Sequence, residues 1–194
     1  MIAFDACPLC GAPLVSLDVT ETYDLRPALP FSVPIEFAIC SGCSFVCQKR
    51  VLPLDVMNRY YADSPKLRTG AASESDTSLY ADQTLFMAQS GELASRRVLD
   101  IGADMGKLLD HLADAYGCET FYQEENATAR AWLTSRGRHR EAAVLVDDEP
   151  FDWIVLSEVL EHVADPVPWL AGLRSHLARD GRIFVEVPNH SFWD

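Results

Sequence analysis

The sequence predicts an α/β protein in which a doubly wound parallel sheet of about five strands follows a small cysteine-rich domain. From residue 96 onward, apolar runs alternate with stretches whose apolar residues recur at helical spacing. Before residue 50, four of the six cysteines form two Cys-x-x-Cys pairs, at 7–10 and 40–43. We therefore expect a cysteine-rich domain over 1–50, a helical linker or lid over 51–95 and the α/β domain over 96–194.

The composition allows one substantial core and limits the partners. Of the 194 residues 48% are hydrophobic, and 16 Lys and Arg against 29 Asp and Glu give a formal net charge of -13. This charge repels a phosphate backbone, so we expect no nucleic-acid partner. Neither an apolar N-terminal leader nor a run of about 18 apolar residues is present. We therefore expect no membrane association and a cytoplasmic protein.

The paired cysteines favour a metal site over disulfides, because no secretion signal precedes them. Each Cys-x-x-Cys turn directs two thiolates at one tetrahedral ion, so two turns would close a structural Zn²⁺ site in a zinc-ribbon-like domain. Rubredoxin-like iron ligation and four unrelated reduced cysteines are the alternatives. Short strands and loops that depend on the metal are expected between the pairs. The four predicted ligands are Cys7, Cys10, Cys40 and Cys43, whereas Cys47 and Cys118 are expected to be thiols outside the site.

Two helices are predicted between the cysteine-rich domain and the first parallel strand. One begins near Leu54 and ends before Pro65, and the other begins near residue 79 after a capping Asp76 or Thr77. The small, polar residues 66–78 between them predict a loop. This segment is either a linker or a lid that orders over a ligand.

The α/β region is expected to contain five strands. They are predicted at 98–102, 119–123, 142–146, 151–157 and 182–188, with helices at 107–117 and 127–137 and one or two more over 158–181. Right-handed crossovers make such a sheet parallel. Its ligand binds at the carboxyl ends of the strands, at the topological switch point beside the first strand.

The stretch VLDIGADMGKLLDHL, residues 98–112, has the pattern of a ligand-binding loop. Gly102 and Gly106 allow the backbone to approach a ligand, and the following helix directs free N–H groups at it. Asp104 stands where a dinucleotide loop carries a third glycine, which disfavours NAD. Glu124, after the second strand, stands where an acid commonly binds both hydroxyls of a ribose.

These features together resemble a class I S-adenosylmethionine-dependent methyltransferase over residues 96–194. VLDIGADMG, SEVLEHV and DGR followed by a strand and VPN are similar to the ubiquinone-type O-methyltransferases. The preceding cysteine domain resembles that of sugar C-methyltransferases. The resemblance implies a Rossmann-like sheet, S-adenosylmethionine as cofactor, and O- or C-methylation of a small-molecule acceptor. Such proteins usually add a C-terminal hairpin that this sequence lacks, so we expect either truncation or a partner, such as a second copy in a homodimer, over the sheet edge.

The resemblance also implies roles for single residues. The ribose would be held by Glu124, and the adenine amino group would lie near Asp147 or Asp148. Ser157 and Glu158 would lie near the methionine and the transferred methyl group. An acidic Asp104 is compatible with a cationic sulfonium. The residues implied around the methionine moiety are Asp100, Gly102, Ala103 and Gly106, and Asp104 is a further candidate cofactor-binding residue.

The EVLEH run carries the candidate catalytic residues Glu161 and His162. Their spacing from Glu158, i, i+3 and i+4, would place all three on one helical face. Three interpretations are open: a divalent cation held by the three residues with His190 as a further ligand, His162 as a metal-free general base, or a structural histidine. The alternatives to an enzyme are a non-catalytic protein of this fold that binds cofactor or a protein partner, and a zinc-ribbon adaptor.

Overall fold

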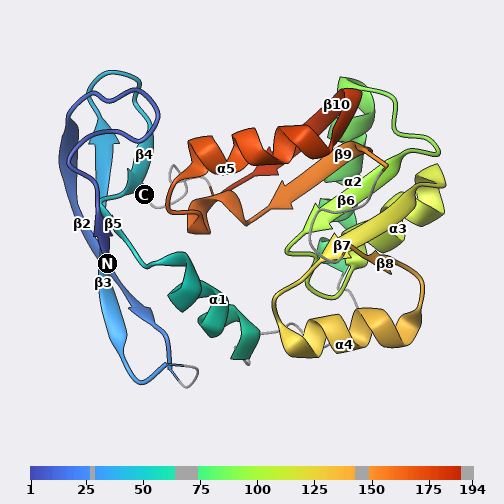
Figure 1. Ribbon diagram of the computed structural model, residues 1–194, viewed down its shortest axis with the longest axis horizontal. Coiled ribbons are helices and arrows are strands. Elements are labelled where there is room, and N and C mark those ends of the chain that lie inside the picture. Colours follow the sequence, from blue (N-terminus) through green and yellow to red (C-terminus); the bar gives the residue numbers. More distant parts are fainter. Residues whose placement is uncertain (27–28, 64–73, 143–148, 189–194) are drawn as a thin grey trace. The chain divides into compact units, whose positions relative to one another are not determined.

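The computed structural model describes residues 1–26, 29–63, 74–142 and 149–188 (Figure 1). The chain forms two compact units. Unit 1 comprises residues 1–65 and 161–172, and unit 2 comprises residues 66–160 and 173–194. Within the described part of the chain, every helix is too short or too polar to cross a membrane.

Unit 1 is built on an antiparallel sheet of three strands in the order β2-β3-β4. The strands are β2 (Leu14–Asp24), β3 (Ser32–Cys40) and β4 (Val46–Gln48), and β1 (Ile2–Ala3) pairs separately with β5 (Arg50–Val51). With 11 and 9 residues, β2 and β3 are longer than the short strands expected between the cysteine pairs, so that expectation was wrong. A register shift between Ser16 and Thr20, with Asp18 at φ 52°, breaks the alternation that would have revealed β2.

The helix α1 (Leu54–Asp63) has the predicted start and ends before Pro65. Its residues Met57 and Tyr60 are buried against Leu25, and together they form the small core of unit 1. The rest of that core is made by partly buried apolar side chains.

Unit 2 contains a parallel sheet of five strands in the order β10-β9-β6-β7-β8. The strands are β6 (Arg97–Ile101), β7 (Glu119–Gln123), β8 (Arg140–Glu141), β9 (Phe151–Ser157) and β10 (Leu177–Glu186). The helix α3 (Lys107–Tyr116) follows β6, and α4 (Ala127–Arg136) follows β7. Because β6 is the first strand and lies between β7 and β9, the switch point is at β6. The predicted doubly wound, Rossmann-like sheet is confirmed.

In the α/β region, the strand boundaries agree with the prediction to within one residue except at the third and fifth strands. The predicted strand 142–146 lies almost entirely outside the described residues, and the described strand β8 precedes it. β10 begins five residues before the predicted strand 182–188, because Leu177 already pairs with Phe151 of β9, and a register shift separates this pair from the regular pairing that starts at Arg182. The predicted helices over 158–181 are a 3₁₀ turn (Leu160–His162), α5 (Pro166–Leu173) and a second 3₁₀ turn (Arg174–His176).

The helix α2 (Glu74–Ser90) begins before the predicted helix. Residues 74–78 are helical, so the loop prediction was wrong there, and Asp76 and Thr77 lie inside the first turns rather than at a cap. Small polar residues signal a loop, but acidic ones also stabilise the first turn of a helix. Residues 66–73 lie outside the described residues, so the lid stays a prediction.

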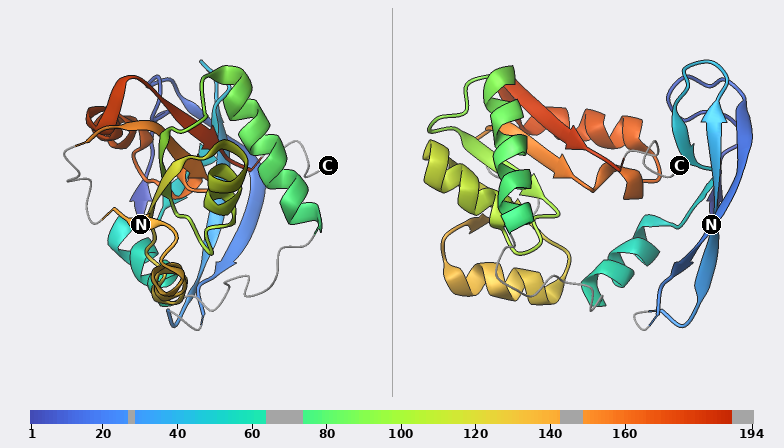
Figure 2. Two further views of the ribbon diagram at one scale, coloured as in Figure 1. Left: turned by 90° about the vertical axis from the view of Figure 1, so that its right-hand side faces the viewer. Right: turned by 180° about the vertical axis from the view of Figure 1, so that it is seen from behind.

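One face of the sheet is covered by α2, α3 and α4 (Figure 2). Each helix contributes a fully buried side chain to this core: Met87 from α2, Leu112 from α3 and Leu133 from α4. Alternate residues of a strand share a face, so Asp100, Ser157 and Glu186, near the carboxyl ends of their strands, also point to this side. The core face of unit 2 therefore ends in a polar edge.

Candidate functional site

The loop between β6 and α3 is a tight turn that requires its glycines. Gly102 has φ 78° and Gly106 has φ 73°, in the left-handed region that favours glycine. A Cβ on Gly102 would lie 2.8 Å from Val159 Cγ2, and one on Gly106 would lie 2.5 Å from Leu133 Cδ2. The Gly102 N–H donates to Gln123 O at 2.8 Å, which ties the loop to the end of β7. The predicted backbone-lined loop therefore forms at the switch point.

Glu124 clamps this loop to the start of α4. Its Oε2 accepts from the Asp104 N–H and its Oε1 from the Asn126 N–H, both at 2.7 Å. Burial raises the pKa of the Glu124 carboxyl, and the nearby Asp104 carboxylate raises it further. Each carboxylate oxygen has a second lone pair for a hydroxyl of a ligand. This arrangement fits the ribose role implied for Glu124.

Asp100 makes the site favourable for a positive charge. It is only 3% exposed, and burial, with the charges of Glu124 and Asp104, raises its pKa to about 8. The Asp100 carboxyl is therefore mostly protonated at pH 7, and a cation bound beside it would favour its charged form. The sulfonium of an S-adenosyl ligand carries such a positive charge.

At the ends of β9 and β10, a polar cluster joins three elements. The Ser157 hydroxyl donates to Glu186 Oε2 at 2.8 Å, and Gln83 Nε2 of α2 donates to both Ser157 Oγ, at 3.1 Å, and Glu186 Oε2. Gln83 and Glu186 were missed by the sequence reasoning. Gln83 lies at the spacing of an apolar helix face, so the sequence offers no sign of a polar role for it. Glu186 is a single acid within an apolar strand, and this pattern could have identified it as a candidate site residue.

The EVLEH run does not form the predicted helical face. Glu158 has φ 56°, which no α-helical residue adopts, and only residues 160–162 are in a 3₁₀ turn. Its N–H instead donates to Glu186 O at 2.9 Å, so it ends β9 rather than beginning a helix. Among the described residues, no metal-ligand cluster includes Glu158, Glu161 or His162. The divalent-cation site is therefore unsupported there, and His190 lies outside the described residues.

Glu161 and His162 belong to unit 1. The His162 ring lies against Tyr61, with centroids 5.1 Å apart, and Nε2 lies 3.7 Å from Glu161 Oε1. Burial lowers the pKa of His162 to about 4, so the imidazole is neutral at pH 7. A neutral imidazole is able to accept a proton, but a pKa this low makes it a weak general base. Their catalytic role stays a prediction.

Of the remaining predicted site residues, Ala103 lies at the edge of the sheet, and two others lie outside the described residues. Ala103 is 7% exposed and lies in the loop, where its carbonyl accepts from the Gly106 N–H at 2.8 Å. Asp147 and Asp148 lie outside the described residues, so the adenine contact is untested. The structure thus places eight predicted residues at the carboxyl ends of β6, β7 and β9: Asp100, Gly102, Ala103, Asp104, Gly106, Glu124, Ser157 and Glu158.

In unit 1 the two cysteine pairs meet. The four sulfurs lie within 4.8 Å of one another, with Cys7 and Cys43 Sγ 3.8 Å apart and Cys10 and Cys40 Sγ 3.4 Å apart. Zn–S bonds of about 2.3 Å in a tetrahedron put sulfurs about 3.8 Å apart, so the cluster has the right size. All six cysteines of the chain are free, and Cys47 and Cys118 lie outside the cluster, as expected.

The turns around the cysteines have matching backbone geometry. The Gly11 N–H donates to Cys7 O at 2.9 Å and the Ser44 N–H donates to Cys40 O at 3.0 Å, each four residues on. The N–H of Gly42 also donates to Cys40 Sγ at 3.3 Å, which would stabilise a thiolate. A Cβ on Gly42 would lie 2.7 Å from Ala12 Cβ, so the two turns pack closely.

The comparisons with known proteins agree with this architecture. A family model for the methyltransferase domain matches residues 73–194. The chain is 30% identical over 116 residues to a ubiquinone biosynthesis O-methyltransferase of Methylococcus capsulatus, covering 55% of this chain and 49% of the relative. It thus spans about half the length of the curated relative it matches.

Two solved structures show the same fold at low identity. The DhpI-SAM-HEP complex has a TM-score of 0.51 and 20% identity, covering 70% of this chain and 65% of its own. The N-methyltransferase NodS of Bradyrhizobium japonicum WM9, in complex with S-adenosyl-L-homocysteine, has a TM-score of 0.50 and 18% identity, covering 66% and 69%. These likenesses concern the fold alone. With the family match over residues 73–194, the chain belongs to the methyltransferase domain family.

Proposed function

We propose that this protein is an S-adenosylmethionine-dependent methyltransferase that acts on a small-molecule acceptor by O- or C-methylation. The observation that carries the proposal is the clamp of Glu124 on the Asp104 N–H, at 2.7 Å. This hydrogen bond joins the glycine turn at the switch point to a carboxylate that is able to accept hydrogen bonds from the hydroxyls of a ribose. The curated relative is an O-methyltransferase by name, which supports an oxygen atom of the acceptor as the nucleophile.

The site residues would bind and orient the ligand rather than react with it. The Gly102–Gly106 turn and the first N–H groups of α3 would contact the amino-acid end, and Glu124 would hold the ribose. Asp104, together with an Asp100 carboxyl that would lose its proton beside the sulfonium, would balance the positive charge. The bound cofactor supplies an already activated methyl group, so alignment of the acceptor provides most of the rate.

Unit 1 would have a structural role in the proposed enzyme. We assign the Cys7, Cys10, Cys40 and Cys43 cluster to Zn²⁺, in a zinc-ribbon-like domain over residues 1–50 with a helical linker over 51–95. Four thiolates leave no open coordination position, so the ion would stabilise the fold without taking part in catalysis. We also propose that a second copy of the chain covers the β10 edge of the sheet in a homodimer.

Titration calorimetry with S-adenosylhomocysteine tests the cofactor site. The wild type should bind, and Glu124→Gln should weaken binding about tenfold, since it loses charged hydrogen bonds to the ribose and to the loop. Glu125→Gln is the matched control, because this neighbouring acid is exposed. No binding to the wild type at millimolar ligand would refute the proposed function.

A further inference from the structure

The cluster of Gln83, Ser157 and Glu186 has hydrogen-bonding capacity that the fold does not use. Gln83 is 5% exposed, and its Oε1 has no hydrogen-bond partner among the described residues. A buried acceptor left unpaired costs about 1–3 kcal/mol. The amide orientation is set by its surroundings, because a flipped amide would turn its oxygen toward the Glu186 carboxylate.

A count of donors and acceptors shows what a ligand must bring. The two Nε2 hydrogens of Gln83 are directed at Ser157 Oγ and Glu186 Oε2, and the Ser157 hydroxyl hydrogen also goes to Glu186 Oε2. All three donor hydrogens are therefore used within the cluster. In the described part of the chain, the acceptors that receive none of these hydrogens are Gln83 Oε1 and the second Glu186 oxygen. Only a group that donates hydrogen bonds, a hydroxyl or an ammonium, would satisfy them.

The place of the cluster in the sheet indicates which ligand would bring that group. Glu124 follows β7 on one side of β6, whereas Ser157 and Glu186 end β9 and β10 on the other side. At about 4.8 Å between strands, β10 lies roughly 10 Å beyond β6. A ligand held by Glu124 at its ribose and by Gly102 at its other end would leave the cluster free for a second molecule.

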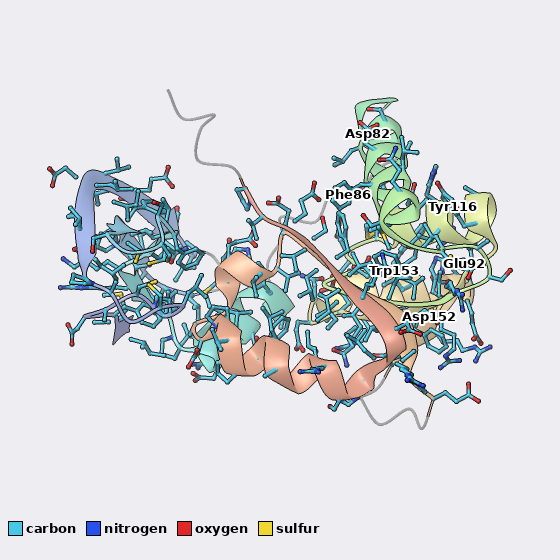
Figure 3. The ribbon with its side chains drawn as sticks, turned by 90° about the horizontal axis from the view of Figure 1, so that it is seen from above. Asp82, Phe86, Glu92, Tyr116, Asp152 and Trp153 are labelled. Atoms are coloured by element: carbon cyan, nitrogen blue, oxygen red, sulfur yellow. The ribbon has the colours of Figure 1, made fainter. Side chains whose placement is uncertain are left out.

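The helix α2 fixes the Gln83 side of this cluster. One turn along α2 lies Phe86 (Figure 3). Its ring packs edge-on against that of Phe184 in β10, with the ring centroids 6.0 Å apart. Further along, Met87 is fully buried in the core. Gln83 is therefore held in position by apolar contacts of its own helix, as a preorganised binding group requires.

We propose that Gln83, Ser157 and Glu186 form a subsite for a hydroxyl or ammonium group of the methyl acceptor. This inference rests on the proposed function, because it takes the cofactor to lie on the Glu124 side of β6. The same chemistry is present in the ammonium group of the cofactor's amino-acid end, and the experiment separates the two sources.

The test compares Gln83→Met and Glu186→Gln with Asp180→Asn. Methionine keeps the length and helix propensity of glutamine but removes its amide. Asp180 is an exposed acid near the start of β10, so its variant removes the same charge from the same strand away from the cluster. Thermal unfolding of each variant checks that the chain is folded.

Two sets of probes are titrated by calorimetry. S-adenosylhomocysteine and 5′-methylthioadenosine, which lacks the amino-acid end, report on the cofactor. Catechol and phenethylamine, added with saturating S-adenosylhomocysteine, supply a hydroxyl or an ammonium. In the wild type, the side-chain amide signals of Gln83 are followed by NMR, with Gln83→Met providing their assignment.

The expected result is that catechol or phenethylamine shifts the Gln83 amide signals and binds at least about tenfold more weakly to both variants. Asp180→Asn should bind as the wild type does. Weaker binding of S-adenosylhomocysteine, with methylthioadenosine unaffected, would support the subsite and assign its donor to the cofactor. If the wild type binds S-adenosylhomocysteine but no probe shifts the Gln83 amide or distinguishes the variants, the subsite is overturned. Failure of the wild type to bind S-adenosylhomocysteine is the separate failure of the proposed function.

Discussion

Replacing Gly106 with alanine should destabilise unit 2 more than the same change at a glycine with open space around it. Gly106 has φ 73°, where a Cβ costs about 1–2 kcal/mol. That Cβ would also lie 2.5 Å from Leu133 Cδ2, and Leu133 is fully buried, so overpacking adds about 1–3 kcal/mol. Gly137 is the matched control, since it has φ 59° but no atom within 4 Å of its Cβ position.

Differential scanning calorimetry of the full chain measures both variants. Gly137→Ala should cost about 1–2 kcal/mol and Gly106→Ala about 2–5 kcal/mol. Each kcal/mol lowers Tm by roughly 2–4 °C in a chain of this size. Equal destabilisation by the two variants would show that the loop does not pack on α4 as described, and the reasoning would fail.

Three further predictions concern the metal cluster, the buried acid and the ribose clamp. Cys40→Ser should release bound zinc, measured by elemental analysis of the purified protein, whereas Cys47→Ser should retain it; zinc content unchanged in both would contradict the cluster. Because the pKa of Asp100 is raised in the folded chain to about 8, its contribution to stability is present at pH 4 and is lost as the pH rises to 8. In urea titrations, the free energy of unfolding of Asp100→Asn should therefore fall less between pH 5 and pH 8 than that of the wild type. An equal fall in both proteins would disprove this. Thermal-shift assays with S-adenosylhomocysteine should show a smaller rise in Tm for Glu124→Gln than for Glu125→Gln, and equal rises would contradict the clamp.

The central strands could be predicted from sequence because their signal is local. β7 and β9 are bounded as predicted, since each is an apolar run between turn signals. The start of β10 was predicted five residues late, because its first residues include polar Arg179 and Asp180 and a register shift interrupts its pairing with β9 before Arg182. In this first part of β10 it is Leu177 that pairs with β9, opposite Phe151, and no local pattern reveals such pairing.

The candidate site was predictable where backbone geometry decides it. Gly102, Gly106 and Glu124 follow from a strand, a turn and a second strand, and each lies where expected. The absence of the predicted helical face could not be seen in the sequence. Glu158 has a positive φ, and its N–H donates to Glu186 O of a strand that is distant in sequence. Gln83 joins the cluster across 74 residues of sequence, and spacing within one helix does not show such a contact.

A crystal structure with S-adenosylhomocysteine would show whether the β6–α3 loop and Glu124 form the cofactor site. We expect the ribose hydroxyls within hydrogen-bond distance of the Glu124 carboxylate and the amino-acid end of the ligand beside Gly102. Ligand bound elsewhere on the chain, or none bound at saturating concentration, would contradict this expectation.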